Sequence, residues 1–399
     1  MNCKEIDEYI YNILEDIIAF RRTIHKYPEI GLQERETTER IKAKLLEYGI
    51  ESQYILDGIG LTFSIQGAKE GERIALRADI DALPMEEETE EIFKSVHKGL
   101  MHACGHDINT SIVLGAAIVL NKFRDQLCGS VKFIFQSGEE TLIGAQKAID
   151  AGIMEGEKLK CMFAFHAKSD IPVGKIGIRA GNAMAASDRI RITVLGKGGH
   201  AAYPHKTVDP IIIAAGIINS LQALVARERA PYDPLVITIS MIHGGTAFNI
   251  TPDSVVMDGT VRSFNPELRA ALPNMITRMA RRLAQSYNGD CEVEYTLGVP
   301  AMRSEPWLYS EVKQVVTDCL GADRIVELPE PSMGSEDFAV FAQFAPVMQI
   351  SVGARDERPN TQYPLHNAKL IFNEGAIRSG IQAACSIAFF LTLKKDKLN

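Results

Sequence analysis

The alternation of short β-branched runs with helical patterns is the feature that most constrains the fold of this chain. "LTFSIQG", "ERIALRADI", "SVKFIFQSG" and "MFAFH" are typical of strands, and a helical pattern over 107–127 lies between the second and the third. Such alternation predicts a mostly parallel α/β sheet. Two helices are expected before it, over 5–27 and 34–49, because Pro28 and Gly31 interrupt an otherwise helical stretch. After "PVMQISVG", a long C-terminal helix is expected from Leu370.

The pattern changes in the middle of the chain. A strand from Asp188, a helix over 208–229, strands over 234–245 and 253–264, a helix over 266–286 and a strand over 290–298 follow in turn. This βαββαβ order is what a small ferredoxin-like domain needs. We therefore predict an α+β domain over 186–295, inserted into a larger α/β domain formed by 1–185 and 296–399.

Composition narrows the possible classes of protein. A chain of 399 residues is too long for one ordinary core, which agrees with two domains. The formal net charge of −8 argues against binding of nucleic acid. Seven widely spaced cysteines and a charged first segment favour a cytoplasmic protein with reduced thiols. The apolar runs are shorter than a membrane span, so no membrane partner is expected.

Groups that can bind metal fall at or near the ends of the predicted strands, or in the loops around them. The crevice at the carboxyl ends of the strands is where sites form in open α/β sheets, so we expect these groups to converge. They are Asp79 and Asp81 of "RADID", Cys104 and His106 of "MHACGHD", Glu139 and Glu140 of "FQSGEE", His166 of "MFAFH", and His366 of "PLHNA".

Their chemistry suits Zn²⁺ or its neighbours, which thiolate, imidazole and carboxylate groups bind. Five candidates (Cys104, His106, Glu140, His166 and His366) exceed the needs of one tetrahedral ion and could hold a pair of ions. The adjacent Glu139 could then act as a general base. Two other interpretations stay open: Cys104 as a nucleophile, which its acidic surroundings disfavour, and purely structural histidines and cysteine. His102 is more easily explained as a structural or supporting residue.

The motifs "RADIDALPMEEE", "MHACGHD", "FQSGEE", "GKGGHAAYPH", "GGTAFNITPD" and "PLHNA" resemble, in order, those of the M20 metallopeptidase family. The most similar branch holds N-acyl-L-amino-acid amidohydrolases, hippurate hydrolases and indole-acetyl-amino-acid hydrolases. The resemblance implies a zinc-peptidase-like α/β catalytic domain, here 1–185 and 296–399, with an inserted α+β ferredoxin-like lid or dimerisation domain. It also implies a homodimer formed through that lid.

The resemblance assigns roles to individual residues. Cys104, His106, Glu140, His166 and His366 would bind two divalent ions, Zn²⁺ or Mn²⁺, with Co²⁺ or Ni²⁺ also acceptable. Glu139 would be the general base. His200 of the lid would stabilise the oxyanion, with His205 as a competing candidate. Asn249 and Arg262 would hold the substrate carboxylate, and Asp79 and Asp81 would support the ligands from behind.

The expected function is therefore metal-dependent hydrolysis of the amide bond of N-acyl-L-amino acids, giving a carboxylate and a free amino acid. Alternatives are a dipeptidase or carboxypeptidase of the same family, an N-acetyldiaminopimelate deacetylase, or a metal-binding protein without catalysis; Glu139 counts against the last. Relatives usually have "LHV" and "FQPAEE" where this chain has "FHA" and "FQSGEE", so the substrate is less transferable than the metal chemistry.

Overall fold

A computed structural model of the chain describes residues 3–394, and these form two compact units. The first unit contains the residues up to Ala183, Arg303–Glu330, and the residues from Asp337 onward. The second unit contains Met184–Met302 together with the short segment Pro331–Glu336. The chain thus leaves the first unit and returns to it twice.

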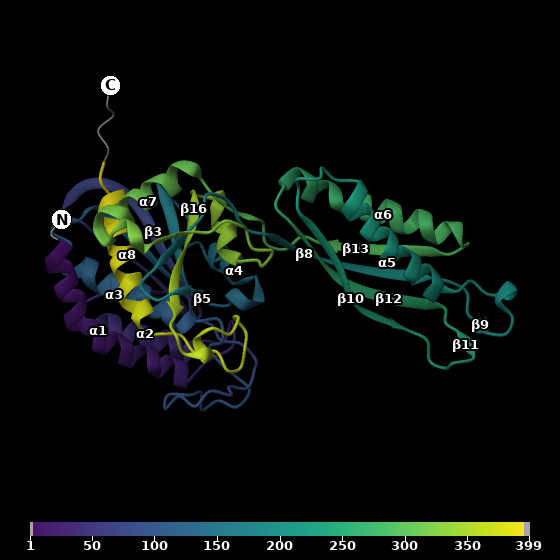
Figure 1. Cartoon of the computed structure of the whole chain (residues 1–399), viewed down its shortest axis with the longest axis horizontal. Helices are drawn as coiled ribbons and strands as arrows, with labels where there is room; N and C mark the ends of the chain where they lie inside the picture. Colours follow the sequence, from purple (N-terminus) through teal and green to yellow (C-terminus); the bar gives the residue numbers. More distant parts are fainter. Residues whose placement is uncertain (1–2, 395–399) are drawn as a thin grey trace, which may run out of the picture. The chain divides into compact units, whose positions relative to one another are not determined.

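An eight-stranded sheet forms the centre of the first unit, in the order β1-β2-β4-β3-β5-β16-β6-β15 (Figure 1). The strands are β1 (Gln53–Leu56), β2 (Ile59–Gln66), β3 (Lys69–Asp79), β4 (Cys128–Gln136), β5 (Cys161–Pro172), β6 (Ile176–Ile178), β15 (Ile325–Glu327) and β16 (Val347–Arg355). The short strands β7 (Gly181–Met184) and β14 (Met302–Ser304) pair with each other.

The sheet is mixed but mostly parallel, as predicted, because its central neighbours and the edge pair β6–β15 are parallel. The neighbours β4, β3, β5 and β16 are parallel, whereas the pairs β1–β2, β2–β4 and β16–β6 are antiparallel. Strands β1 and β2 are joined by the two-residue turn Asp57-Gly58, with Gly58 at φ 73°, which is the chemistry of a tight hairpin. A hairpin reverses the chain and therefore makes this edge antiparallel.

Helices cover the sheet. They are α1 (Cys3–Lys26), α2 (Arg35–Glu47), α3 (His106–Lys122), α4 (Gly144–Asp150), α7 (Pro306–Leu320) and α8 (Gly375–Leu391), with short 3₁₀ helices η1 (Glu139–Thr141), η3 (Ala322–Arg324), η4 (Asp337–Gln343) and η5 (Pro359–Thr361). Helices α1, α3 and α8 pack against one another, and α3 and α8 also contact the central strands. Helix α3 is buried from His106 to Leu120, which places its first residue deep inside the unit.

Helix α8 begins at Gly375 rather than at the predicted Leu370. The intervening residues form hydrogen bonds to other segments: Ile371 N donates to Asn360 O, and Asn373 N donates to Ala354 O at the end of β16. The side chain of Asn373 then accepts a hydrogen bond from Gly375 N at 2.8 Å. Because these residues form tertiary hydrogen bonds, the helix begins only at Gly375.

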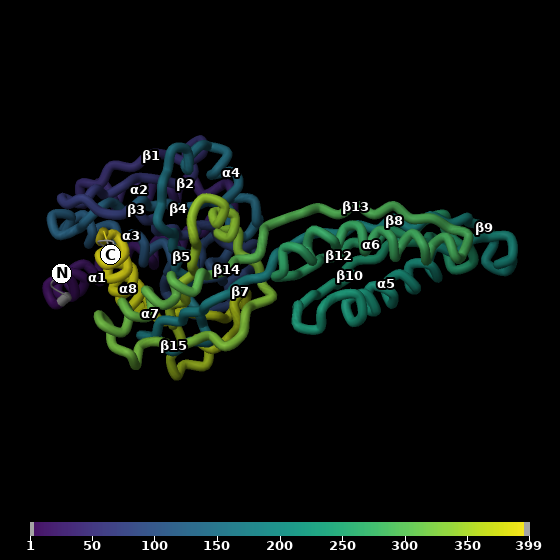
Figure 2. Tube along the Cα trace, turned by 90° about the horizontal axis from the view of Figure 1, so that it is seen from above, coloured from purple at the N-terminus to yellow at the C-terminus, as the bar shows by residue number. Residues whose placement is uncertain are grey.

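The second unit is a four-stranded antiparallel sheet in the order β10-β12-β8-β13, against which α5 and α6 pack (Figure 2). Its elements are β8 (Ala186–Leu195), α5 (Pro210–Arg227), β10 (Leu235–Gly244), β12 (Ser254–Ser263), α6 (Pro266–Ser286) and β13 (Asp290–Thr296), and outside the sheet lie β9 (Gly199–His200), η2 (Pro204–Lys206) and β11 (Ile250–Thr251). The strand and helix order along the chain is βαββαβ. Apolar residues of all six elements form one core.

One helix of the described residues, α5, is apolar and long enough to cross a membrane by length and composition alone. Its residues Ile213, Ile217, Leu221 and Leu224 are buried in the core of the second unit. A single helix of this kind is weak evidence for a membrane span, because core helices pass the same test.

The close packing of α3 on α8 gives a test of the first unit. A Cβ atom at Gly380 would lie 2.4 Å from Cδ1 and 2.6 Å from Cγ1 of Ile112. We expect Gly380→Leu to force the two helices apart and to cost about 1–3 kcal/mol or more. Thermal unfolding of the variant should begin at a lower temperature than that of Ala271→Leu, a control on the exposed face of α6. Unfolding of both variants at the same temperature would contradict this close packing of α3 on α8.

Candidate metal centre

The predicted ligands of the first unit do converge. Asp79 is the last residue of β3, Glu139 and Glu140 begin η1 just after β4, and Cys104 and His106 lie at the start of α3. His166 lies inside β5, which continues to Pro172 instead of ending at the histidine as expected. His366 lies in the loop between β16 and α8. Parallel strands β3, β4 and β5 bring these groups to the same edge of the sheet.

Two imidazoles are oriented by hydrogen bonds from their Nδ1 atoms. His106 Nδ1 lies 3.0 Å from Asp81 O and 3.2 Å from Asp81 Oδ1, and His166 Nδ1 lies 2.8 Å from Ala167 O. Because these partners are acceptors, Nδ1 carries a proton in both rings, and Nε2 is the atom that each ring can offer to a metal ion. Burial acts to lower the pKa of His106, but the charge of Asp79 and the hydrogen bond to Asp81 outweigh it and raise the pKa well above its ordinary value, so a metal ion would take the place of the Nε2 proton. His106 Nε2 has no hydrogen-bond partner within residues 3–394. A buried nitrogen atom of this kind fits a metal ligand.

Cys104 is the centre of the cluster. Its Sγ lies 3.5 Å from His166 Nε2 and 3.4 Å from His366 Nε2, and His366 Nε2 lies 3.4 Å from Glu140 Oε1. The possible ligand atoms form two sets of three, and within each set all atoms lie within 4.8 Å of one another. The sets are Cys104–His106–His166 and Cys104–Glu140–His366. The two sets share Cys104. The donor set of thiol, imidazole and carboxylate therefore fits two neighbouring divalent ions.

Glu139 lies beside this pair of ligand sets. Its Oε2 atom is 3.9 Å from His106 Nε2, and its Oε1 atom accepts a hydrogen bond from Asp337 N at 3.5 Å. With His106 and Glu140 it forms a third group of closely spaced ligand atoms. The side chain is buried, with 6% of its residue surface exposed. Consecutive carboxylates thus face one cluster from different directions.

Asp79 and Asp81 lie behind the ligands. Asp81 contacts His106 through Oδ1 and accepts a hydrogen bond from Glu140 N at Oδ2, at 3.0 Å, so it links two ligand segments. Asp79 accepts hydrogen bonds from Asn109 at 2.7 Å and Arg77 at 2.6 Å. Asp81 thus lies where it can orient His106 and the Glu140 segment. The hydrogen bonds of Asp79 are instead with residues outside the ligand groups, and its Oδ1 atom lies 3.8 Å from His106 Nε2. The supporting role of both carboxylates stays a prediction.

The backbone of two loops takes special conformations at the cluster. Gly105 has φ 83°, and a Cβ atom there would lie 2.9 Å from the ring of Phe372, so glycine is required on both grounds. His366 has φ 63°, a conformation uncommon for a residue other than glycine. Its amide donates a hydrogen bond to Ala103 O at 3.1 Å, which joins the His366 loop directly to the Cys104 loop.

The pKa values follow from this burial. Burial raises the pKa of the Cys104 thiol, since it disfavours the thiolate. Burial also lowers the pKa of His166 well below its ordinary value, so this imidazole is neutral and able to act as a ligand. For Glu140, burial acts to raise the pKa, but hydrogen bonding to His366 and the charge of His106 lower it below the ordinary value.

A buried ionic cluster next to the site was missed at the level of sequence. Asp107 Oδ2 lies 2.7 Å from Arg21 Nε and 2.7 Å from His25 Nδ1, and His25 Nε2 lies 3.3 Å from Glu87 Oε1. All four side chains are buried. His102 is buried nearby, its ring centroid 6.2 Å from that of His25, and it belongs to none of the ligand groups among the described residues. Asp107 and Glu87 lie in the motifs "MHACGHD" and "RADIDALPMEEE", but nothing in the sequence links them to Arg21 and His25.

The other predicted residues lie in the second unit. His200 and Asn249 are exposed around the short β9–β11 pair, and Asn249 O accepts a hydrogen bond from Ala201 N. Arg262, on β12, is partly buried, and its guanidinium donates to Ser335 Oγ at 2.7 Å. Burial lowers the pKa of Arg262 from its ordinary value.

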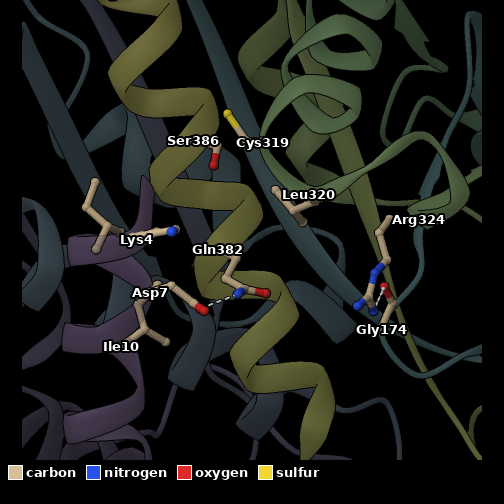
Figure 3. Close-up of a pocket in the computed structure, with 10 residues that line it drawn as sticks. Lys4, Asp7, Ile10, Gly174, Cys319, Leu320, Arg324, Gln382 and Ser386 are labelled. Carbon is tan, nitrogen blue, oxygen red and sulfur yellow. Dashed lines mark hydrogen bonds between the residues drawn. The ribbon is translucent and has the colours of Figure 1, made fainter. Parts of the chain in front are cut away.

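A separate cavity of about 260 Å³ lies between α1, α7 and α8 in the first unit (Figure 3). Lys4, Asp7, Arg324 and Gln382 line it, and Asp7 forms a hydrogen bond with Gln382. Its described lining residues include none of the predicted ligands. The cavity is therefore distinct from the metal-type cluster.

The fold and the cluster together define a hydrolase of the dinuclear metal type. The model of the peptidase family M20/M25/M40 matches residues 75–389, and the chain belongs to this family. Its predicted membership of the M20 family is confirmed, and so is the prediction of a hydrolase that acts on amide bonds.

Three similar proteins illustrate the family. Thermostable carboxypeptidase 1 of Saccharolobus solfataricus is 38% identical over 383 residues, covering 94% of this chain and 95% of the relative. N-acetylcysteine deacetylase of Bacillus subtilis is 39% identical over 341 residues, which cover 84% of this chain and 88% of the relative. The crystal structure of a dinuclear metal-binding M20 peptidase from Bacillus subtilis matches with a TM-score of 0.83 and 33% identity. The match covers 96% of this chain and 100% of that protein. The ligand groups and this neighbour support two divalent ions.

The cluster around Asp107 predicts a pH dependence of stability. Burial and Arg21 act to lower the pKa of His25, but Asp107 and Glu87 outweigh them and the pKa is raised. In the unfolded chain the pKa of a histidine is about 6.5. Because the folded pKa of His25 is higher, protonated His25 contributes its full stabilisation of the folded state below about pH 6.5, and this contribution is lost as pH rises through the folded pKa. We expect His25→Gln to cost about 1.5–3 kcal/mol at pH 6.

Urea unfolding of wild type and variant from pH 6 to pH 9 measures this difference, which should shrink as pH rises. His243→Gln, at an exposed position of β10, is the control and should cost little at any pH. A cost of His25→Gln that stays constant over this range would contradict a charged His25.

Proposed function

We propose that this protein hydrolyses the amide bond of N-acyl-L-amino acids. The observation that carries the proposal is the pair of ligand sets sharing Cys104, with the carboxylate of Glu139 beside them. Cys104, His106 and His166 would hold one ion, and Cys104, Glu140 and His366 the other. Zn²⁺ or Mn²⁺ suits these donors, and Co²⁺ or Ni²⁺ is also acceptable. When bound, the ions polarise the amide carbonyl and lower the pKa of water.

Glu139 acts as the general base. Its carboxylate takes a proton from the attacking water while the water oxygen bonds to the amide carbon, and it gives this proton to the nitrogen as the C–N bond breaks. The products are a carboxylate and a free amine. The hydrogen bond from Asp337 N to Oε1 holds the carboxylate while the other oxygen carries the proton.

We also propose, from the family resemblance, that the second unit is a ferredoxin-like lid whose residues act on the substrate. The His200 imidazole would donate a hydrogen bond to the carbonyl oxygen as negative charge develops there. Arg262 would pair with the free carboxylate of the amino-acid part, and Asn249 would assist with its amide. Arg262 suits this role because its partly buried guanidinium donates a hydrogen bond to a neutral group, the hydroxyl of Ser335.

A carboxypeptidase or dipeptidase activity is the alternative, because a thermostable carboxypeptidase is as similar to this chain as the N-acetylcysteine deacetylase. An N-acetyldiaminopimelate deacetylase would be a special case of the main proposal. The two classes differ in whether the pocket accepts an acyl chain or a charged α-amino group. Both need the same base and the same ligands.

A substrate panel with a variant tests the function. After chelation and return of Zn²⁺ or Mn²⁺, the protein should release amino acid from N-acetyl- and N-benzoyl-amino acids faster than it cleaves dipeptides.

Glu139→Gln should keep about two ions per chain and lose about 10³-fold or more in kcat, because it cannot take the proton. Metal analysis and product assay are the measurements. Cleavage of dipeptides alone would favour the alternative, and full activity of Glu139→Gln would exclude this mechanism.

We also propose that the protein forms a homodimer through the second unit. Strand β10 lies at an edge of the four-stranded sheet, and its Met241 and Ile242 are each 51% exposed. Ile211 and Ile212 at the start of α5 are also exposed. Exposed apolar edge strands are surfaces that a second chain can cover.

We expect Ile242→Lys to convert the dimer into a monomer, since a buried unpaired charge at such an interface costs several kcal/mol. Light scattering after size-exclusion chromatography measures the mass. Leu46→Lys, at an exposed position of α2, is the control and should leave the dimer intact. A wild-type protein that elutes as a monomer would exclude the dimer.

A further inference from the structure

The segment Ile30–Glu34, between α1 and α2, packs under the loop that carries Glu139 and Glu140. Glu34 is completely buried, although it is an acid at the start of a helix. A Cβ atom at Gly31 would lie 3.0 Å from Asp81 Oδ2 and 3.1 Å from Gly138 Cα. The two segments are therefore in close contact, and nothing larger than glycine fits between them without movement.

The carboxylate of Glu34 binds the loop at two consecutive residues. Its Oε2 atom accepts a hydrogen bond from Ser137 Oγ at 2.6 Å, and its Oε1 atom accepts one from Gly138 N at 2.9 Å. Ser137 Oγ in turn accepts a hydrogen bond from Leu32 N at 3.2 Å. The backbone and one side chain of Ile30–Glu34 thus hold both residues that immediately precede Glu139.

The loop reverses direction at these residues. Gly138 has φ 73°, a left-handed conformation, and η1 starts directly after it. On the other side of the turn, Glu140 N donates to Asp81 Oδ2. The turn is therefore fixed by a buried carboxylate on each side, Glu34 before Glu139 and Asp81 at Glu140.

We propose that Glu34 is a positioning residue, which holds the Ser137–Gly138 turn so that Glu139 meets the substrate water and Glu140 meets its ion. This inference rests on the proposed function for Glu139, whereas its consequence for Glu140 depends only on metal binding. Glu34 touches none of the ligands itself. It acts through the backbone that carries them.

The protonation of Glu34 decides which variant is a fair control. Burial, and then the charge of Asp81, raise its pKa to about 7, so both forms of the carboxyl group are populated near neutral pH. The groups facing it are Asp81, Ser137 and the Gly138 amide. In the neutral form the carboxyl group donates to Ser137 Oγ and still accepts from Gly138 N. Glutamine reproduces that form, with Nε2 as donor and Oε1 as acceptor.

The test compares Glu34→Met, which leaves Ser137 and Gly138 without this partner, with Glu34→Gln as the matched control. Calorimetric titration with Zn²⁺ and with Mn²⁺ measures the two ions independently of any substrate. We expect Glu34→Met to bind one of the two ions about 10–100-fold more weakly, as when a group supporting a ligand is lost. Glu34→Gln should bind both ions within about threefold of wild type, a difference of less than 1 kcal/mol.

Turnover gives the second measurement. With both ions saturating, Glu34→Met should lower kcat on an N-acyl amino acid by about 10²-fold with little change in KM, because the base is displaced and the substrate contacts are not. Glu34→Gln should restore kcat. Normal metal affinity and kcat in Glu34→Met, or equal losses in both variants, would overturn the proposal.

Two further comparisons keep the test decisive. If Glu34→Met does not fold, Ser137→Ala is the second variant: it removes the hydrogen bonds of Ser137 Oγ with Glu34 and Leu32 N but keeps the one from Gly138 N to Glu34. It should weaken the binding of one ion and lower kcat by about 3–10-fold, as expected for roughly 1 kcal/mol. Normal metal affinity and kcat in Ser137→Ala would overturn the proposal. If wild type cleaves no acylated amino acid, the proposed function fails, but the metal titrations still decide whether Glu34 positions Glu140.

Discussion

The concentration of buried carboxylates at one edge of the sheet is the constraint on which the site depends. Asp79, Asp81, Glu139 and Asp337 are each at most 6% exposed, and Glu140 lies beside them. Buried anions are stable only when they are paired, hydrogen bonded or bound to metal. Arg77 contacts Asp79 and Asp337 at 2.6 and 2.8 Å and so neutralises part of this charge from behind. The remaining negative charge faces Cys104 and the imidazoles, which is where two cations fit.

The convergence of the ligands could be predicted from sequence for a simple physical reason. Asp79 and the Glu139–Glu140 pair follow neighbouring parallel strands, and the carboxyl ends of such strands meet whatever the rest of the fold does. His166 was expected at the end of the strand "MFAFH", but β5 continues six residues beyond it. The antiparallel direction of β1 and β2 follows from the local Asp57-Gly58 turn rather than from the strand ends, whereas that of β16 and β6 depends on tertiary contacts.

The supporting residues could not be predicted because their partners are distant in the chain. Asp107 meets His25, which lies 82 residues earlier, and Ser137 meets Glu34, which lies 103 residues earlier. Neither contact follows a helical or strand period, so no local pattern signals it. Both involve α1 or the segment after it, for which the sequence predicted only a helix and an interruption at Pro28 and Gly31. Helix α1 and that turn thus contribute to the site without supplying a ligand.

Different roles for two consecutive acids follow from the backbone that carries them. The left-handed Gly138 and the single turn of η1 send Glu139 toward Asp337 N and Glu140 toward His366. If these two residues lay in a flexible loop, both carboxylates could compete for one ion, because their chemistry is identical. What would separate the proposed base from the proposed ligand is therefore the rigidity of the turn. That rigidity comes from Asp81 and Glu34, two carboxylates that bind the peptide chain rather than the metal.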